Sequence, residues 1–425
     1  MISDLVLLLS QIVVILVSAR LVGWALRLLY QPQVMGEIIA GLFLGPSLLG
    51  WLAPGLSDVL FPSHSLSALN TIGNIGVLLF IFGVGLKLDL AHLWERGRAV
   101  LMIAHVSIAV PLVLGTGLAI YLYPFLSDTE VPLAVFALFT GVAMGVTALP
   151  VLARILEECR LAESSLGTIA LSIAAMKDVI AWCLLAGVMA LHTYTIALDT
   201  LALKVIAAGL FTLALLYAVP RVFHVLLQKS HPSGRLTNNM WILMLLTMTG
   251  SAWITERLGV HALFGAFLAG VALSKSPIPA SNALTKFESF TAAVLLPIFF
   301  ASVGLRTSFG LIYGTQLWIY FGLILLVAVV GMWGGTTIAA RLAGMPWAES
   351  TTIGILMNTR GLMEIVILSI GRDVGIISST MFAIMLLMTL VTTGMATPLL
   401  RLYRPDRVRQ TVPHRIEMPD SFKQS

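Results

Sequence analysis

The stretch SIAAMKDVIAWCLLAGVMA, Ser172–Ala190, is long enough to cross a bilayer and almost wholly apolar, yet it holds Lys177 and Asp178 side by side. An Asp or Lys at the centre of a membrane helix costs roughly 2.5 to 3.5 kcal/mol, so such charges persist mainly where they face a bundle interior and carry ions or protons. Adjacent helical residues point about 100° apart and cannot pair face to face. The stretch therefore predicts a membrane protein with an ion or proton pathway.

The composition agrees with this prediction. Hydrophobic residues make up 58% of the chain and charged residues 11%, whereas soluble proteins carry about 25% charged residues. No Ser/His/Asp or Cys/His grouping offers nucleophilic catalysis, and the eight His and two Cys residues lack metal-ligand spacing. We expect no enzyme activity, no cofactor, no nucleic-acid binding, and no metal beyond a transported monovalent cation.

The apolar windows predict an all-α polytopic protein with about thirteen transmembrane helices in a transporter domain over residues 1–402. An odd number of spans puts the two termini on opposite sides of the membrane. If the N-terminus is outside, most of the 25 Lys and Arg residues fall in cytoplasmic loops, as the positive-inside rule requires. The C-terminus is then cytoplasmic, with residues 403–425 as a short basic tail.

Two pairs of spans resemble each other. The second span reads GEIIAGLFLGPSLLG from Gly36, and the ninth reads VHALFGAFLAGVALS from Val260. The ends of the third and tenth spans align Val84–Lys87 with Val303–Arg306. Because seven spans separate the members of each pair, they enter the membrane from opposite sides. This pattern predicts a six-plus-six inverted repeat, the build of many secondary transporters that bind substrate near the bilayer midplane.

The fifth span is predicted to be a broken helix. Its sequence, FTGVAMGVTALPVLARIL, contains Gly145, Thr147 and Pro150. Proline lacks a backbone N–H and disfavours helical geometry at the residue before it. The carbonyls freed around Thr147 and Ala148 become candidate cation ligands.

The twelfth span carries a matching break. In TTIGILMNTRGLMEIVIL, Asn358, Thr359 and Gly361 surround Arg360, a charge at about the same depth as the first break. Unwound backbone in a membrane is tolerated only where protein or water covers it. We therefore expect the two broken helices to cross at the centre of the bundle.

Asp178 is the candidate binding group for both a cation and a proton. A carboxylate held away from water binds either a proton or a dehydrated monovalent cation, and competition together with a conformational change suffices for exchange. Lys177 and Arg360 are its candidate charge partners, and Glu364 lies four residues after Arg360 on the same helix face, where the two can pair. With one such carboxylate, we expect electroneutral exchange.

Two alternatives remain open. The same fold can couple an ion gradient to an organic solute, such as an anion attracted by Lys177 and Arg360. The chain can also be a transport-inactive sensor or partner subunit that uses these charges only for structure.

Several motifs carry a family resemblance from about Val6 to Leu400. The chain resembles the monovalent cation:proton antiporters, which include the Kef-type potassium efflux systems and the plant cation/proton exchangers. The motifs are GVTALPVLARIL, AAMKDVIAW, VHALFGAFLAG and MNTRGLMEIVIL, followed by FAIMLLMTLVTT and TPLL. In that family the acid matching Asp178 carries the ion, and a basic residue matching Arg360 lies opposite it. Lys177 departs from the Asp, Asn or Gln that the family commonly has there.

The resemblance also implies an architecture. It predicts a homodimer in which a core part, about 98–192 and 315–402, moves like an elevator against a dimerisation part, about 1–95 and 200–304. It further implies K+ or Na+ and H+ as the exchanged ions and a location in the cell membrane, the inner membrane of a bacterium. No G-x-G-x-x-G pattern occurs, so we expect no nucleotide-binding regulatory domain in this chain.

His261 opens the ninth span near Glu256. Histidine titrates in the physiological range, so a pH-sensing role is open. We favour the simpler interpretation, an interfacial polar residue.

Overall fold

The computed structural model describes residues 4–29, 31–87, 97–127, 130–159, 161, 164–193, 198–229, 238–259, 261–274 and 289–403. Within these ranges all regular structure is helical, as predicted. The predicted basic tail lies outside the described residues except for Tyr403.

The described part of the chain contains nine helices long and apolar enough to cross a membrane, or ten if one bent pair counts as a single span. The longest are α1 (Asp4–Leu28), α5 (Ser63–Lys87), α7 (Gly97–Leu126), α10 (Ser165–Thr193), α11 (Leu198–Lys229) and α20 (Ser379–Leu402). Two apolar helices of 13 residues, α8 (Leu133–Gly145) and α13 (Ala262–Ser274), are too short for this criterion. The chain is a multi-pass membrane protein, and the count of thirteen stays a prediction.

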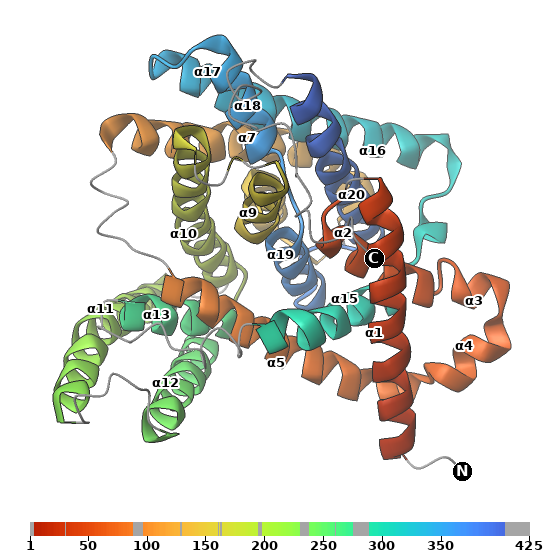
Figure 1. Ribbon diagram of the computed structural model, residues 1–425, viewed down its shortest axis with the longest axis horizontal. Helices are drawn as coiled ribbons and strands as arrows, with labels where there is room; N and C mark the ends of the chain where they lie inside the picture. Colours follow the sequence, from red (N-terminus) through yellow and green to blue (C-terminus); the bar gives the residue numbers. More distant parts are fainter. Residues whose placement is uncertain are drawn as a thin grey trace, which may run out of the picture.

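The helices form two groups, which Figure 1 shows as an upper and a lower part. The core group comprises α7, α8, α9 (Leu149–Glu158), α10, α16 (Gly314–Val329), α17 (Gly335–Leu342), α18 (Trp347–Met357), α19 (Leu362–Asp373) and α20. The frame group comprises α1, α2 (Gln33–Leu44), α3 (Leu49–Leu52), α4 (Pro54–Leu60), α5, α11, α12 (Asn238–Arg257), α13 and α15 (Leu296–Leu305). The division into a core part and a dimerisation part stays a prediction.

Glycines allow two close helix crossings in the frame group. A Cβ on Gly85 of α5 would lie 2.4 Å from the Phe267 carbonyl oxygen of α13, and one on Gly304 of α15 would lie 2.1 Å from the Gly41 carbonyl carbon of α2. Neither position therefore has room for a side chain. Since Gly85 and Gly304 occupy equivalent places in the aligned segments, the two crossings agree with the inverted repeat.

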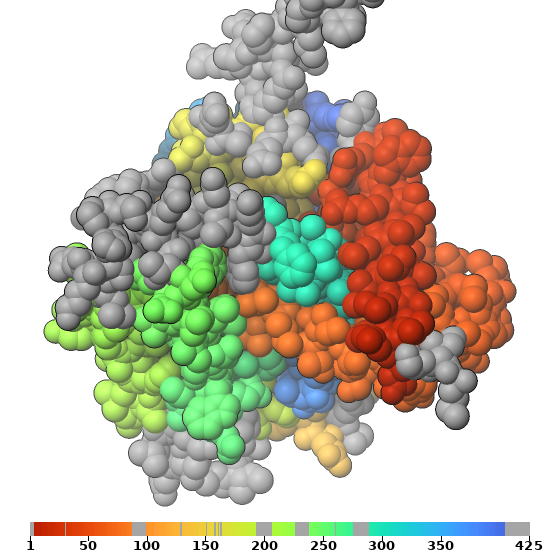
Figure 2. All heavy atoms as spheres, turned by 60° about the horizontal axis from the view of Figure 1, so that its bottom comes forward, coloured from red at the N-terminus to blue at the C-terminus, as the bar shows by residue number. Residues whose placement is uncertain are grey.

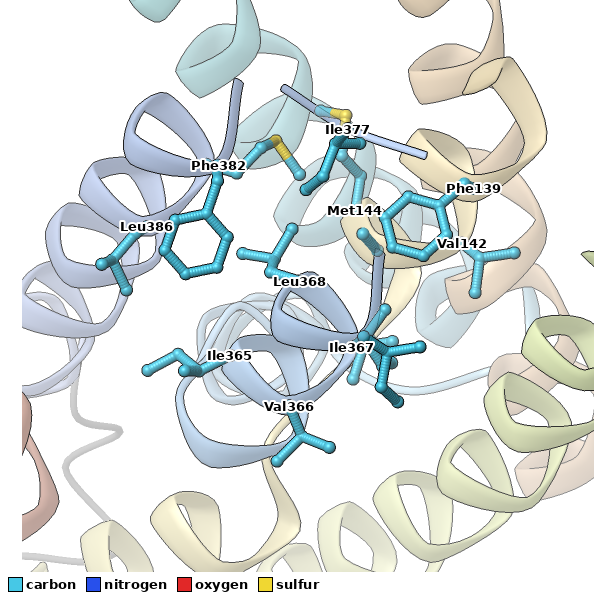
Figure 3. Packing of buried hydrophobic residues seen from close by; sticks show 14 of the residues in the cluster. Phe139, Val142, Met144, Ile365, Val366, Ile367, Leu368, Ile377, Phe382 and Leu386 are labelled. Atoms are coloured by element: carbon cyan, nitrogen blue, oxygen red, sulfur yellow. The ribbon is translucent and has the colours of Figure 1, made fainter. Parts of the chain in front are cut away.

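Apolar packing holds the core group together. Phe139 and Met144 of α8, Ile367 of α19 and Phe382 of α20 belong to one buried cluster, seen at close range in Figure 3. The outward faces differ, since large apolar side chains such as Leu9, Val13 and Leu21 of α1 remain exposed, as expected for a surface that meets lipid. In Figure 2, α1 lies at the front in red, beside α5 in orange and α15 in teal.

The charge pattern predicts that several helix ends lie outside the membrane. These ends contact one another. Arg306 after α15 pairs with Asp373 at the end of α19 at 2.8 Å, and the Ser378 hydroxyl donates to the Leu126 carbonyl at 2.8 Å. We call this side the outer face, following the predicted orientation. Toward the opposite face, the Gln31 amide donates to the Gly394 carbonyl of α20 at 3.2 Å and joins the frame group to the core group.

Candidate functional site

The two predicted broken helices meet. The first break, Val146–Ala148, separates α8 from α9, and the second, residues 358–361, separates α18 from α19, whose axes differ by 41°. The Ala148 N–H donates to the Thr359 carbonyl at 3.0 Å, and the Thr147 hydroxyl donates to the Met357 carbonyl at 2.8 Å. The breaks therefore hydrogen-bond to each other in the interior, where backbone groups need protein partners.

The first break lies just before Pro150. Helix α9 begins at Leu149, so Leu149 is helical and Pro150 occupies the first turn, where a missing N–H removes no helical hydrogen bond. The Ala148 carbonyl accepts from the Leu152 N–H at 2.9 Å, which leaves it less available to a cation than predicted. Among the described residues, no backbone N–H donates to the Thr147 carbonyl.

The second break depends on Gly361 and on α20. Gly361 has φ 151°, a conformation that residues with a side chain rarely adopt, and a Cβ there would meet Val151 Cγ2 at 2.9 Å. The Arg360 N–H donates to the Thr393 hydroxyl at 2.9 Å, and that hydroxyl donates to the Arg360 carbonyl at 2.8 Å. Thr393, which was not predicted to belong to the site, thus holds both backbone groups of Arg360.

Arg360 closes the C-terminal end of α8. Its guanidinium donates to the carbonyls of Ala143 at 3.2 Å and Met144 at 2.6 Å, and to Glu364 Oε1 at 3.1 Å. Both Arg360 and Glu364 are fully buried, and their predicted pairing is present. A cation at this position is favourable because the last carbonyls of a helix lack partners and carry partial negative charge.

Lys177 and Asp178 point to different neighbours, as their adjacent positions on α10 predict. Lys177 Nζ donates to the Ser107 carbonyl of α7 at 3.2 Å and contacts Met332 Sδ at 2.9 Å. Met332 lies in a π-helical turn, Val330–Gly334, and its sulfur is also 4.0 Å from the Thr147 hydroxyl. Met332 therefore links Lys177 to the first break.

Asp178 is buried and has no hydrogen-bond partner within the described ranges. Its side chain is 1% exposed, and no hydrogen-bond donor among the described residues reaches either carboxylate oxygen. It lies on α10, which packs against α8, α9 and α18 at the crossing. An ionised carboxylate in such a place is costly unless a proton or a cation compensates it.

The sequence is similar to known transport proteins. The family model "Sodium/hydrogen exchanger, transmembrane" matches residues 14–402. The chain is 38% identical to Cation/H(+) antiporter 19 of Arabidopsis thaliana, over 96% of this chain and 51% of that protein. It is 37% identical to Na(+)/H(+) antiporter NhaS4 of Synechocystis, over 93% and 97%. The chain therefore spans about half the length of the plant relative and nearly all of the cyanobacterial one.

A solved structure has the same fold. The sodium proton antiporter MjNhaP1 from Methanocaldococcus jannaschii superimposes with a TM-score of 0.60 over 96% of this chain and 99% of that one, at 14% sequence identity. At this identity the likeness concerns the fold alone.

Proposed function

The chain belongs to the family of transmembrane sodium/hydrogen exchangers, and from this membership we propose that it exchanges a monovalent cation, K+ or Na+, for H+ across the cell membrane. Both relatives described above are named as antiporters of a cation and H+. The proposed carrier of both ions is Asp178.

The observation that carries this proposal is the unpartnered carboxyl of Asp178. A structural acid at 1% exposure would be held by donors or by an ion pair, because an unmet buried charge is expensive. Within the described part of the chain, no donor occupies either oxygen of Asp178, which leaves both for a ligand. A proton or a dehydrated cation satisfies the same carboxylate in turn, so each ion displaces the other.

The neighbouring charges define the site without occupying it. Lys177 is close enough to act on Asp178 electrostatically, yet its amine donates to Ser107 and Met332. Arg360 is held by the end of α8 and by Glu364. Among the described residues, Asp178 is the one group of the four whose side chain makes no hydrogen bond and no ion pair, and this favours electroneutral exchange of one cation for one proton.

Alternating access requires Asp178 to move between two faces. We place the movement at the boundary between the core group and the frame group, with α10 carrying Asp178 past α13. This elevator movement and a homodimer formed through the frame group are parts of the proposal.

Proteoliposomes with a preset proton gradient and a pH-sensitive dye test the exchange. Adding K+ or Na+ should dissipate the gradient, and Asp178→Asn should abolish the signal. Asp58→Asn, the same change at an exposed acid of α4, is the matched control and should exchange normally. Normal exchange by Asp178→Asn would refute the carrier assignment.

The same assay separates the alternatives. If the proton gradient dissipates only when an organic solute is added, the protein is a symporter. If the gradient does not dissipate under any condition, the protein is a sensor or partner subunit. With the membrane potential clamped at different values, a rate that follows voltage would exclude electroneutral exchange.

A further inference from the structure

A cavity of about 260 Å³ lies between the core group and the frame group at the outer face. Its polar lining comes from three places in the fold: Asn74 of α5, Glu256 and His261 beside the α12–α13 connection, and Ser369 and Asp373 of α19. Water occupies roughly 30 Å³ per molecule in the liquid, so the cavity has room for a small ion with a shell of water. The exchange chemistry described above uses none of these side chains.

The two carboxylates of the cavity differ in their partners. Asp373 pairs with Arg306 at 2.8 Å and has Arg372 at 3.9 Å, so its charge is compensated. Glu256 Oε2 accepts the Ala262 N–H at 2.7 Å, and within the described part of the chain Glu256 makes no ion pair. The negative charge left for a ligand is therefore that of Glu256.

Ser369 adds an unmet polar group to the cavity wall. Its side chain is only 9% exposed, and its hydroxyl has no hydrogen-bond partner among the described residues. Buried hydroxyls in folded proteins are nearly always hydrogen-bonded, and a rotation of the Ser369 side chain that turns its buried hydroxyl into the cavity would give it a water or a ligand as partner. Oxygen donors are the ligands that hard cations take from proteins.

We propose that this cavity binds a hydrated monovalent cation, held by the Glu256 carboxylate and by oxygens of Ser369 and Asn74, before the ion reaches Asp178. The site rests on the proposed cation exchange, for which it is a waiting position on the outer side. Its ligand keeps water, unlike the dehydrated ion expected at Asp178.

An aromatic stack separates the cavity from Asp178. Leu263 lines the cavity, and one turn deeper on α13 Phe267 stacks against Trp182 of α10, with ring centroids 6.1 Å apart. Trp182 lies one turn from Asp178 on the same helix and is 2% exposed. Because Trp182 belongs to the core group and Phe267 to the frame group, sliding of the two groups would part the rings and connect the cavity to Asp178.

Cysteine protection tests the binding site directly. In a background with Cys159→Ala and Cys183→Ala, Ser369→Cys reports access to the cavity through its rate of modification by a cationic methanethiosulfonate. We expect K+ or Na+ to slow this reaction several-fold relative to N-methyl-D-glucamine, a bulky cation, at equal ionic strength. Asn74→Cys, at an exposed position of the same cavity, provides a second reporter if Ser369→Cys does not fold.

Glu256→Gln should remove the protection, since it removes the charge but keeps an oxygen that can accept the Ala262 N–H. Asp58→Asn, which removes a charge elsewhere on the predicted outer face, should leave protection intact. In transport, Glu256→Gln should raise the KM for the outer cation several-fold with little change in kcat. Equal modification rates in K+, Na+ and N-methyl-D-glucamine would overturn the proposal. Equal effects of Glu256→Gln and Asp58→Asn on protection would also overturn it.

The carrier variant separates this site from the proposed exchange. Protection should persist in Asp178→Asn, because the cavity lies outside the aromatic stack. If the cation protects the cavity cysteine but the protein without transport-site substitutions does not exchange ions, the exchange proposal is refuted and the cavity site is not. If the protein exchanges ions but the cation does not protect the cavity cysteine, the cavity site is refuted and the exchange proposal is not.

Discussion

At the scale of single residues, the fully buried ion pair between Arg360 and Glu364 links the second break to the end of α8. Taking two charges out of water is costly, so the pair is tolerated through its hydrogen bonds to the Ala143 and Met144 carbonyls. Arg360 is the only charged partner of Glu364 among the described residues, so Glu364 depends on Arg360 for compensation of its charge.

Removing Arg360 alone should therefore lower the stability of the protein more than removing the charges of both Arg360 and Glu364. Arg360→Met leaves a buried, unpaired carboxylate and should cost about 3 to 5 kcal/mol of stability. Adding Glu364→Gln should recover part of the melting temperature lost in detergent. If the effects of the two substitutions simply add, the residues are not coupled.

His261 should make the outer cavity sensitive to pH. Its Nδ1 accepts the Leu263 N–H at 3.4 Å, so a second proton on the ring breaks this bond and places a positive charge at the N-terminus of α13. The charged groups near it are Glu256 of α12 and Asp373 of α19, with Arg372 and Arg306 beside Asp373.

Burial lowers the pKa of His261 below its ordinary value of 6.5, so cation protection of Ser369→Cys should weaken only when the outer pH falls well below 6.5. Glutamine stays neutral over this range, so in the His261→Gln variant the cation should protect Ser369→Cys from modification equally at acid and neutral pH. Identical pH profiles with and without His261 would exclude His261 as the source of the dependence and leave it the interfacial role favoured by its sequence position.

At the scale of elements, the two breaks are unlike each other. The first is three residues without helical structure before α9, whereas the second requires a positive φ at Gly361. Hydrogen bonds between the breaks hold both of them, and Thr393 of α20 holds the second as well, so their geometry is fixed by neighbours and not by local propensity.

Gly361→Ala should distort the second break. The new methyl group would need a rarely adopted conformation and would meet Val151, so we expect a lower melting temperature and at least tenfold slower exchange. Gly187→Ala, in α10 with open space around it, is the matched control and should be neutral or slightly stabilising. Equal behaviour of the two variants would contradict the need for glycine at 361.

Sequence reasoning located both breaks but not what holds them. Gly145, Pro150 and Gly361 have local signatures of interrupted helices. Thr393 and Met332 have none, because threonine and methionine are common in apolar helices and their partners lie far away in the chain. For the same reason, the contact of Lys177 with Met332 could be found only from the folded structure and not from the sequence.

At the scale of the whole molecule, exchange by an elevator movement requires the core group to slide against the frame group. The pair of Arg306 and Asp373 crosses this boundary and is accessible from solvent, with side chains 37% and 39% exposed. It must separate when the groups move.

A covalent bridge at this position should stop transport. In the background without cysteines, Arg306→Cys with Asp373→Cys should lose exchange after treatment with a short bifunctional thiosulfonate and regain it after reduction. Each single variant should keep exchanging under the same treatment. Continued exchange by fully bridged protein would exclude relative movement of the groups.

The sequence predicted the helical class, the family and the charges at the crossing. The number of spans stays a prediction, since α8 and α13 are too short for the length criterion and α18 and α19 form a bent pair that can count as one span. The outer cavity escaped prediction because its polar residues come from distant segments and each one looks like an ordinary helix end.

The π-helical turn at Val330–Gly334 holds one residue more than a regular helical turn. Loss of a single residue there would restore an unbroken α-helix and rotate Met332 by about 100°, away from the amine of Lys177. Contact between the thioether and that amine therefore depends on the length of this helical turn as well as on methionine at position 332.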